Sequence, residues 1–261
     1  MTDRMREVDV VRRDGEDDEP IADQVAVEEP LEIRLGAAPL AVMMRTPGDD
    51  TDLATGFFLT EAILLDPGEI AAVEMPEEGR LSVLLRDGLD VDPARFQRNL
   101  FVSSSCGVCG KASIESVQLF AKPAPEFSVP REIVAGLTER LRAQQPTFEA
   151  TGGLHAAGLF DLQGRALAVR EDVGRHNAVD KAIGAAAAQQ WPLPQCLLVV
   201  SGRQSFEIVQ KAAVVGIGGV VGVSAPSSLS VELAESLGLL LVGFARGANF
   251  NVYAGSAHLS T

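Results

Sequence analysis

The stretch CLLVVSGRQSFEIVQKAAVVG, residues 196–216, decides the fold. It opens with five apolar residues in a row, a pattern typical of a strand that is buried on both faces of a sheet. Beyond a short polar turn, apolar residues recur every three or four positions, which predicts a helix. The same order returns in VVGVSAP at 220–226, SSLSVELAESLG at 227–238 and LLLVGFARG at 239–247. Because strands that alternate with helices need crossover connections, we predict an α/β fold with a mostly parallel sheet.

Comparable elements flank this stretch and extend the same domain. The sequence predicts helices at 131–145 and 173–190 and strands at 154–160, 166–172 and 250–255. Residues 122–130, KPAPEFSVP, are predicted to be a linker because three of the nine are proline. We therefore place an α/β domain at 126–261.

Residues 25–125 have a mixed pattern that predicts a smaller α+β domain. Residues 25–48 alternate loosely and break at 36–38, which indicates a hairpin. A helix is predicted at 49–65 and a strand at 81–91, before the segment SSSCGVCGK at 103–111. The smaller domain would thus end in a loop that carries two cysteines.

The first 24 residues are predicted to be a disordered acidic leader. Eleven acidic residues against four arginines in residues 1–30 leave a net charge of −7, half of the −14 of the whole chain. A segment with so much charge and so little apolar content buries too little surface to fold by itself.

Composition also limits where the protein works and what it binds. The net charge of −14 argues against broad nucleic-acid binding. The first twenty residues contain no apolar segment of the kind that a secretory signal needs, and the longest apolar runs are too short and glycine-rich to cross a bilayer. Three cysteines do not make an extracellular disulfide framework. We expect a cytoplasmic protein that binds neither nucleic acid nor membrane.

Small and basic residues follow four predicted strands of the larger domain. These segments read EDVGRHN at 171–177, SGRQS at 201–205, SAPSS at 224–228 and FARGAN at 244–249. Ligands of open α/β sheets bind beyond the carboxyl ends of the strands, where small residues let backbone N–H groups approach phosphate and arginine adds a bidentate fork. Arg175, Arg203 and Arg246, together with Ser201, therefore predict a nucleotide or another multiply phosphorylated ligand. The alternative is that these residue types are simply common in such turns. No P-loop motif is present.

The three histidines have different expected roles. His155 lies in a predicted apolar strand, where a hydrogen-bonded core histidine is the default. His176 follows Gly174 and Arg175 at a strand–helix junction and is a candidate for the binding site. His258 lies in a polar tail, where we expect no function.

The pair Cys106 and Cys109 fits several chemistries. A closed zinc site needs four ligands, and the remaining cysteine, Cys196, starts a buried strand without a second pair. Zinc deaminases pair H-x-E with P-C-x-x-C, and neither half is complete here. Dithiol oxidoreductases usually open a helix with this motif, which Gly107 and Gly110 disfavour. Five of the nine residues of SSSCGVCGK are glycine or serine, so a mobile loop is expected, and redox chemistry and sulfur carriage both stay open.

Six segments, in the same order, closely resemble the formate dehydrogenase accessory sulfurtransferase family, FdhD. They are PLEIRLGAAPLAVMMRTPGDDTDLATGFFLTEAIL, SSSCGVCGKASIE, EDVGRHNAVDKAIG, SGRQSFEIVQKAA, SAPSSLSVELAE and GFARGANFNVYAG, which together cover about residues 25–256. The resemblance implies a cytidine-deaminase-like three-layer larger domain without zinc, and a homodimer. It also implies sulfur transfer, as a cysteine persulfide, from a cysteine desulfurase to the molybdenum or tungsten of a bis(molybdopterin guanine dinucleotide) cofactor destined for formate dehydrogenase.

The resemblance also assigns residues. The persulfide site falls on Cys106, with Cys109 as its neighbour in the motif, and GDP is the expected fragment of the bound cofactor. The cofactor-binding segment falls on Phe244, Ala245, Arg246, Gly247, Ala248 and Asn249. Two alternatives remain: a non-catalytic chaperone that delivers the mature cofactor, and a dithiol oxidoreductase.

Overall fold

The computed structural model describes residues 4–15, 17–89, 91–97, 121 and 123–260. The strands of the larger domain are β8 (His155–Asp161), β9 (Ala166–Asp172), β10 (Cys196–Val200), β11 (Gly219–Gly222), β12 (Leu240–Arg246) and β13 (Asn249–Ala254). Its helices are α4 (Arg131–Arg142), α5 (Pro146–Thr151), α6 (Arg175–Ala187), α7 (Phe206–Val214) and α8 (Ser228–Leu237). Near the C-terminus lie η2 (Ser256–His258) and β14 (Leu259–Ser260), and β14 pairs with β7 (Val129–Pro130). Every element predicted after residue 130 is therefore confirmed.

The six-stranded sheet is mixed, so the prediction of a mostly parallel sheet is wrong. Its order is β13-β12-β11-β10-β8-β9, and of its five described pairs two, β10–β11 and β11–β12, are parallel. Short connections at 162–165 and 247–248 reverse the chain, and a tight turn can only join antiparallel strands. As a result the C-terminal ends of β9, β10, β11 and β12 lie together with the N-terminal ends of β8 and β13. We call this border of the sheet, where those strand ends lie, the sheet edge.

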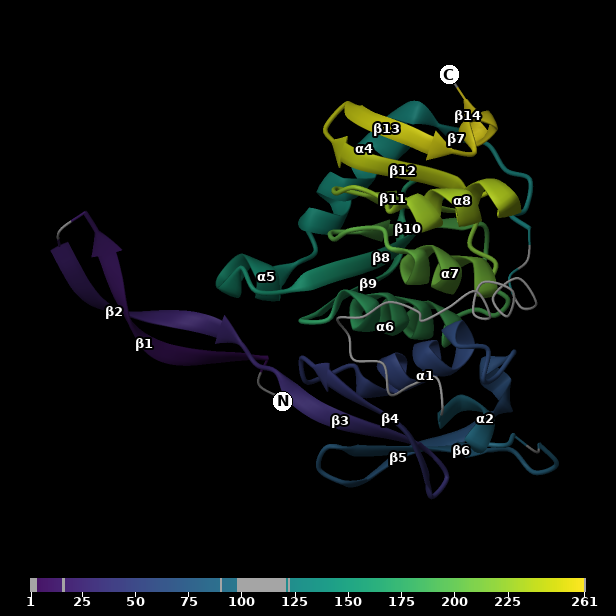
Figure 1. Ribbon diagram of the computed structural model, residues 1–261, viewed down its shortest axis with the longest axis horizontal. Helices are drawn as coiled ribbons and strands as arrows, with labels where there is room; N and C mark the ends of the chain where they lie inside the picture. The colour runs from purple at the N-terminus through teal and green to yellow at the C-terminus, as the bar shows by residue number, and fades with distance from the viewer. Residues whose placement is uncertain (1–3, 16, 90, 98–120, 122, 261) are drawn as a thin grey trace.

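Helices cover both faces of this sheet, which confirms the three-layer α/β architecture (Figure 1). On β10, Leu198 and Val200 pack under α6, α7 and α8, whereas Leu197 and Val199 pack under α4. Neighbouring residues of a strand point to opposite faces, so a continuous apolar run is what a strand between two helical layers needs.

The smaller domain has a four-stranded sheet in the order β4-β3-β6-β5. Its elements are β3 (Glu29–Leu35), β4 (Ala38–Arg45), α1 (Asp50–Thr60), η1 (Pro67–Glu69), β5 (Ile70–Glu77), β6 (Arg80–Leu85) and α2 (Ala94–Gln97). The predicted hairpin and helix are confirmed, whereas β5 was not predicted. No helix in the described part of the chain is both long and apolar enough to cross a membrane.

Helix α1 of the smaller domain packs closely on α6 of the larger domain. A Cβ at Gly56 would lie 1.8 Å from the backbone oxygen of Asp180, and one at Gly184 would lie 2.0 Å from that of Asp52. Only glycine permits such an approach, because any side chain at either position would overlap the opposite backbone. The two domains therefore meet along a glycine-lined helix crossing.

The prediction of a disordered leader is wrong for its described residues. They form β1 (Met5–Asp14) and β2 (Asp17–Ala26), an antiparallel hairpin that projects from the body of the molecule (Figure 1). Contacts between the two strands explain why this segment is structured. Val10 lies opposite Ile21, and Arg13 forms an ion pair with Asp18 at 2.8 Å. Composition alone does not predict this pairing, because acidic residues interrupt the alternation of apolar and polar residues on each strand.

Candidate functional site

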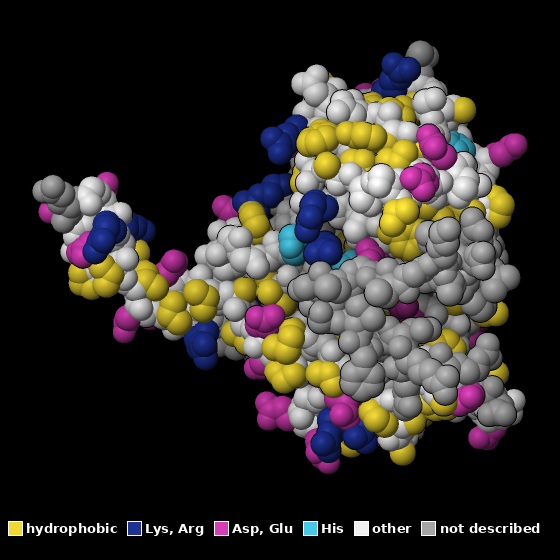
Figure 2. Space-filling model, in the orientation of Figure 1, with side chains coloured by type: hydrophobic (Ala, Val, Ile, Leu, Met, Phe, Trp, Pro, Cys, Tyr) yellow, Lys and Arg dark blue, Asp and Glu magenta, His cyan; other side chains and the backbone are white. Residues whose placement is uncertain are grey.

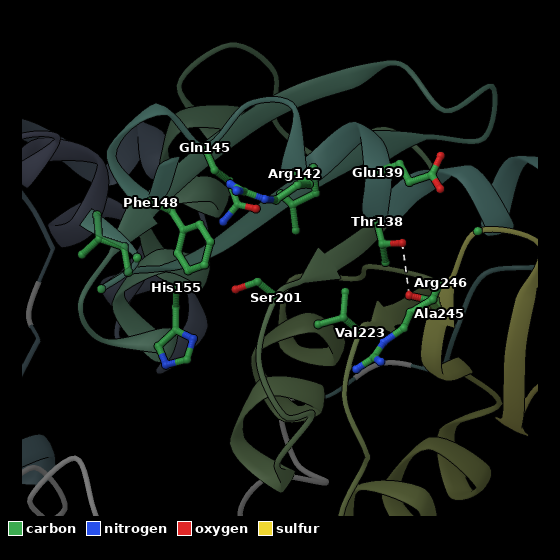
Figure 3. A pocket seen from close by; sticks show the side chains of 15 residues that line it. Thr138, Glu139, Arg142, Gln145, Phe148, His155, Ser201, Val223, Ala245 and Arg246 are labelled. Atoms are coloured by element: carbon green, nitrogen blue, oxygen red, sulfur yellow. Dashed lines mark hydrogen bonds between the residues drawn. The ribbon is translucent and has the colours of Figure 1, made fainter. Parts of the chain in front are cut away.

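A cavity of about 610 Å³ opens at the sheet edge where β10, β11 and β12 end. One wall comes from α4 and α5, and the other comes from the segments that follow the strands (Figure 3). The predicted residues Ser201, Ala245, Arg246 and Gly247 line it. The structure thus brings two of the predicted segments, from β10 and β12, into one site.

Ser201 holds the end of β10 against the beginning of β8. Its Oγ accepts a hydrogen bond from the Ala156 amide at 2.9 Å, and its own amide donates to the Ala156 oxygen at 3.0 Å. The neighbouring residue, His155, is thereby fixed at the cavity wall. The absence of a side chain at Gly202 leaves room there, since a Cβ would lie 3.3 Å from His155 Nδ1 and 3.8 Å from Arg175 Cβ.

The prediction that His155 is a hydrogen-bonded core residue is wrong. Its side chain is half-buried on the cavity wall and has no hydrogen bond to any described residue. Burial lowers the pKa of His155, and the charges of Arg175 and Arg203 lower it further. His155 is therefore neutral at pH 7 and lies next to two positive charges.

The three arginines predicted at the strand ends lack acidic partners among the residues that the structure describes. Among the described residues Arg175, Arg203 and Arg246 form no ion pair, and the buried Nε of Arg175 has no hydrogen-bond partner. Arg170, by contrast, is paired with Asp52, 2.8 Å away. Figure 2 shows basic side chains beside a histidine on this face of the molecule. In a chain with a net charge of −14, arginines that lack acidic partners among the described residues beside a cavity are suited to an anionic ligand.

The remaining residues of the predicted segment 244–249 lie around the turn from β12 to β13. Phe244 is 44% exposed and has a φ of +53°, a left-handed conformation that costs a bulky residue about 1–2 kcal/mol. Ala248 and Asn249 are exposed beyond it. Thr138 Oγ1 of α4 donates to the Ala245 oxygen at 3.2 Å and so ties this turn to the opposite wall. Backbone strain of this kind is concentrated at functional sites in proteins.

His176 lies in the first turn of α6, near the segment that follows β10. Its Nε2 is 3.5 Å from Ser205 Oγ and 3.9 Å from Glu207 Oε2. Burial lowers the pKa of His176 to about 4, with help from the charges of Lys211 and Arg175. The side chain is therefore a neutral hydrogen-bonding group at pH 7.

The segment EDVGRHNAVDK has a second, structural task that its sequence did not reveal. Asp172 is fully buried, and its Oδ2 lies 2.8 Å from Lys181 Nζ. Lys181 Nζ also donates to the Thr46 oxygen at 2.7 Å, and Asn177 Nδ2 donates to the Met44 oxygen at 2.8 Å. These bonds join α6 to the end of β4 in the smaller domain, and they fix the turn that carries Arg175 and His176.

Glu171 of the same segment positions the far wall of the cavity. Its buried carboxylate accepts hydrogen bonds from the amides of Thr147 and Phe148, at 3.0 Å and 2.7 Å, at the start of α5. The wall residues Gln145, Phe148 and Arg142 were not among the predicted site residues. They follow no strand, so the rule that ligands bind beyond strand ends does not find them.

A second ionic cluster lies deeper between the domains. Lys211 Nζ donates to Glu61 Oε1 at 2.7 Å, to Thr60 Oγ1 at 2.9 Å and to Asp180 Oδ2 at 3.0 Å. Burial raises the pKa of Asp180 to about 6. Burial also acts to lower the pKa of Lys211, but the charges of Asp180 and Glu61 outweigh it and raise that pKa above its ordinary value. The cluster ties α1 to α6 and α7.

The other predicted residues that the structure describes do not line the cavity: Arg175, His176, Arg203, Phe244, Ala248 and Asn249. Cys106 and Cys109 fall outside the described residues. Cys196 is buried, and burial raises the pKa of its thiol to about 12. His258, for which we expected no function, stacks on Phe127 with ring centroids 4.2 Å apart and so has a structural role. No group of three or more His, Cys, Asp or Glu side chains in the described part of the chain is arranged to hold a metal.

The fold and the cavity define the class of protein: a mixed α/β sheet whose candidate ligand site lies beyond its strand ends. Within that class, the FdhD/NarQ family profile matches residues 26–260, and the chain belongs to this family.

Named relatives and a solved structure agree with this assignment. The chain is 46% identical over 248 residues to "Sulfur carrier protein FdhD" of Streptomyces coelicolor, covering 90% of this chain and 88% of the relative. It is 48% identical over 250 residues to the protein of the same name from Nocardia farcinica, covering 91% and 88%. A crystal structure from Desulfotalea psychrophila, provisionally described as a formate dehydrogenase accessory protein, superposes with a TM-score of 0.81. At 24% identity, covering 99% of this chain and 100% of that one, it supports the fold alone.

Proposed function

We propose that this protein is a sulfur carrier that serves formate dehydrogenase. The observation that carries the proposal is the similarity to relatives named sulfur carrier protein FdhD over about nine-tenths of the chain, 90% for the Streptomyces coelicolor protein. The sequence supplies the pair Cys106 and Cys109, and the cavity supplies an anion-binding site at the sheet edge. One site loads sulfur and the other holds the acceptor.

Loading begins at Cys106. Its thiolate attacks the outer sulfur of a persulfide on a cysteine desulfurase, so that a new S–S bond forms and the donor cysteine leaves as a thiolate. A thiol of ordinary pKa, about 8.5, is only a few per cent ionised at pH 7, which makes this step faster at higher pH. No net oxidation occurs, because the sulfane sulfur changes carrier without changing its oxidation state.

Delivery sends this sulfur to the metal of a bis(molybdopterin guanine dinucleotide) cofactor, the substrate of the reaction. In our proposal the Cys109 thiolate attacks Sγ of Cys106, which forms a Cys106–Cys109 disulfide and releases the outer sulfur as sulfide to the metal. The two thiols supply the two electrons, and an external dithiol reduces the disulfide before the next cycle. The protein contributes proximity and orientation.

The cofactor presents two guanosine monophosphate groups joined through pyrophosphates. In our proposal Arg246, Arg203 and Arg175 bind these phosphates, with Ser201 as a hydroxyl donor and His176 as a neutral neighbour. Each charge-assisted hydrogen bond contributes about 1.5–3 kcal/mol. Calorimetry with GDP measures the contribution: Arg246→Ala is expected to weaken GDP binding at least tenfold, and an unchanged affinity would remove Arg246 from the site.

The test of sulfur transfer is mass spectrometry after incubation with a cysteine desulfurase and cysteine. The wild type should gain one sulfur atom that reduction removes, and Cys106→Ala should gain none. Cys196→Ala is the matched control and should load normally, because the Cys196 thiol is buried and its pKa is raised to about 12. If Cys106→Ala still activates formate dehydrogenase fully, the alternative function is favoured, that of a non-catalytic chaperone for the mature cofactor. We also expect a homodimer, which light scattering will test.

A further inference from the structure

We infer that the α4–α5 wall of the cavity is a subsite for a flat nitrogen heterocycle, in which Gln145 pairs with the polar edge of the ring. This inference rests on the proposed function, because the ligand class is the guanine nucleotide. It adds a base-binding site to the phosphate-binding arginines.

The first observation is the state of Gln145. The residue lines the cavity and is only 5% exposed, yet its side-chain amide has no hydrogen bond to any described residue. It precedes α5 without capping that helix through its side chain. The Gln145 amide is thus free to bond whatever occupies the cavity, and a ligand that supplies both a donor and an acceptor can replace water there.

The second observation is a stacking surface beside this amide. The Arg142 guanidinium lies 4.6 Å from the centroid of the Phe148 ring, and both side chains line the cavity with Gln145. Phe148 is held in place because its backbone amide donates a hydrogen bond to Glu171 Oε1 at 2.7 Å. Aromatic rings and guanidinium planes both stack on flat heterocycles. The wall therefore offers a flat surface next to a hydrogen-bonding edge.

The third observation is the distribution of charge across the cavity. Figure 3 shows Gln145 and Phe148 on one wall and Arg246 on the other, with Ser201 between them. Of the two arginines that line the cavity, Arg142 on the α4 wall forms an ion pair, whereas Arg246 on the strand-end side forms none among the described residues. A volume of about 610 Å³ falls in the range of about 300–1,000 Å³ that small-molecule sites occupy. A nucleotide would thus place its base on the α5 wall and its phosphates at the strand ends.

The polar edge that Gln145 recognises is the 2-amino-4-oxopyrimidine edge, where a ring N–H adjoins a carbonyl oxygen. A glutamine amide pairs with this edge through one accepted and one donated hydrogen bond. Because the amide can turn over, Gln145 accounts for affinity and not for discrimination against adenine. Guanine and the pterin ring share this edge, so the base or the pterin of the cofactor are its two sources.

The test compares ligands with and without a base by calorimetry on the full chain. Gln145→Leu should weaken GDP binding about tenfold, the loss of roughly one buried hydrogen-bonded edge, and leave inorganic pyrophosphate binding unchanged. Arg246→Ala should weaken both ligands. The matched control is Gln144→Leu. The side-chain amide of Gln144 lies outside the cavity, where it donates a hydrogen bond to the Arg140 oxygen at 3.2 Å.

The outcomes separate this inference from the proposed function. If the wild type binds neither GDP nor pyrophosphate, the proposed cofactor site is wrong. If the wild type binds GDP and Gln145→Leu binds it equally well, the base subsite is wrong and the phosphate site stands. A free pterin that binds the wild type more than tenfold more tightly than Gln145→Leu, while GDP is unaffected, would assign the wall to the pterin ring and overturn the guanine assignment.

Discussion

Two regions of this molecule bury polar and charged side chains, and they differ in how fully those side chains are paired. Between the domains, the ammonium group of Lys211 donates to three oxygens and Lys181 lies between Asp172 and the Thr46 oxygen. At the sheet edge, by contrast, Gln145 and Arg175 Nε have no partner among the described residues. The first region satisfies its own hydrogen bonds, whereas the second requires groups from outside.

The difference teaches which buried polar groups hold the fold and which bind ligands. A complete network stabilises one arrangement of the elements, because breaking any member leaves a charge without compensation. An incomplete network costs free energy in the free protein and regains it when a ligand arrives. Both occur within the single segment EDVGRHNAVDK, where Asp172 and Lys181 join the domains while the buried Nε of Arg175 has no partner among the described residues.

The largest expected effect is the loss of one partner in the network between the domains. Lys211→Met leaves Asp180 and Glu61 without their shared cation, so we expect a loss of about 3–5 kcal/mol in the free energy of unfolding. Urea denaturation measures it. The control is Arg165→Met, whose ion pair with Asp161 is on the surface, with Arg165 78% exposed, and should cost less than about 1 kcal/mol. Equal effects would mean that burial of the pair contributes nothing.

The next effect is a pH dependence that arises from His176. Its pKa falls from 6.5 in the unfolded chain to about 4 in the folded protein, so the unfolded state binds more protons between these values. Stability from this residue is therefore complete above pH 6.5 and is lost as the pH falls toward 4, by about 1 kcal/mol per pH unit. Asp180 acts in the opposite direction, because its raised pKa favours the folded state below about pH 6. The difference between wild type and His176→Gln isolates the histidine: denaturation curves at pH 7 and pH 5 should show the wild type losing more stability.

A smaller loss is expected from Gly56→Ala at the helix crossing. The added Cβ would lie 1.8 Å from the Asp180 oxygen, so α1 and α6 must separate, at a cost of about 1–3 kcal/mol. Gly136→Ala on the open side of α4 is the matched control, since its Cβ would lie 3.7 Å from the nearest side-chain atom and should stabilise that helix slightly. Thermal melts of both variants test whether the domains are fixed to each other at this crossing.

The sequence was most informative where structure depends on local pattern. The alternation from residue 196 to residue 247 specified each strand and helix correctly, and the predicted strand at 166–172 matches β9 residue for residue. Strand direction is different, because a buried apolar run reads the same in a parallel and an antiparallel pair. The hairpin of β8 and β9 was therefore mistaken for part of a parallel sheet.

The candidate site was predicted in the same uneven way. Arg246 and Ser201 follow strands, and the rule about strand ends placed them at the cavity correctly. Gln145 and Phe148 reach the cavity only because Glu171, on a distant segment, fixes the start of α5. No local sequence pattern predicts such a long-range contact. His155 shows the same limit: a histidine that opens a strand lies at the sheet edge, and the exact start of a strand is the least certain feature of a sequence prediction.

The smallest effect on stability is expected at the unpaired arginines, and it is the sharpest test of the comparison. Arg203 has no acidic partner among the described residues, and its charge helps to lower the pKa of His155. Arg203→Gln should therefore change the free energy of unfolding by no more than about 0.5 kcal/mol, in either direction, because no bond within the described protein is lost. The pKa of His155, followed by NMR titration, should rise toward its ordinary value, and GDP binding should weaken. If Arg203→Gln instead destabilised the protein as Lys211→Met is expected to do, the arginine would have a structural partner, and the sheet edge would belong with the network between the domains rather than with a ligand site.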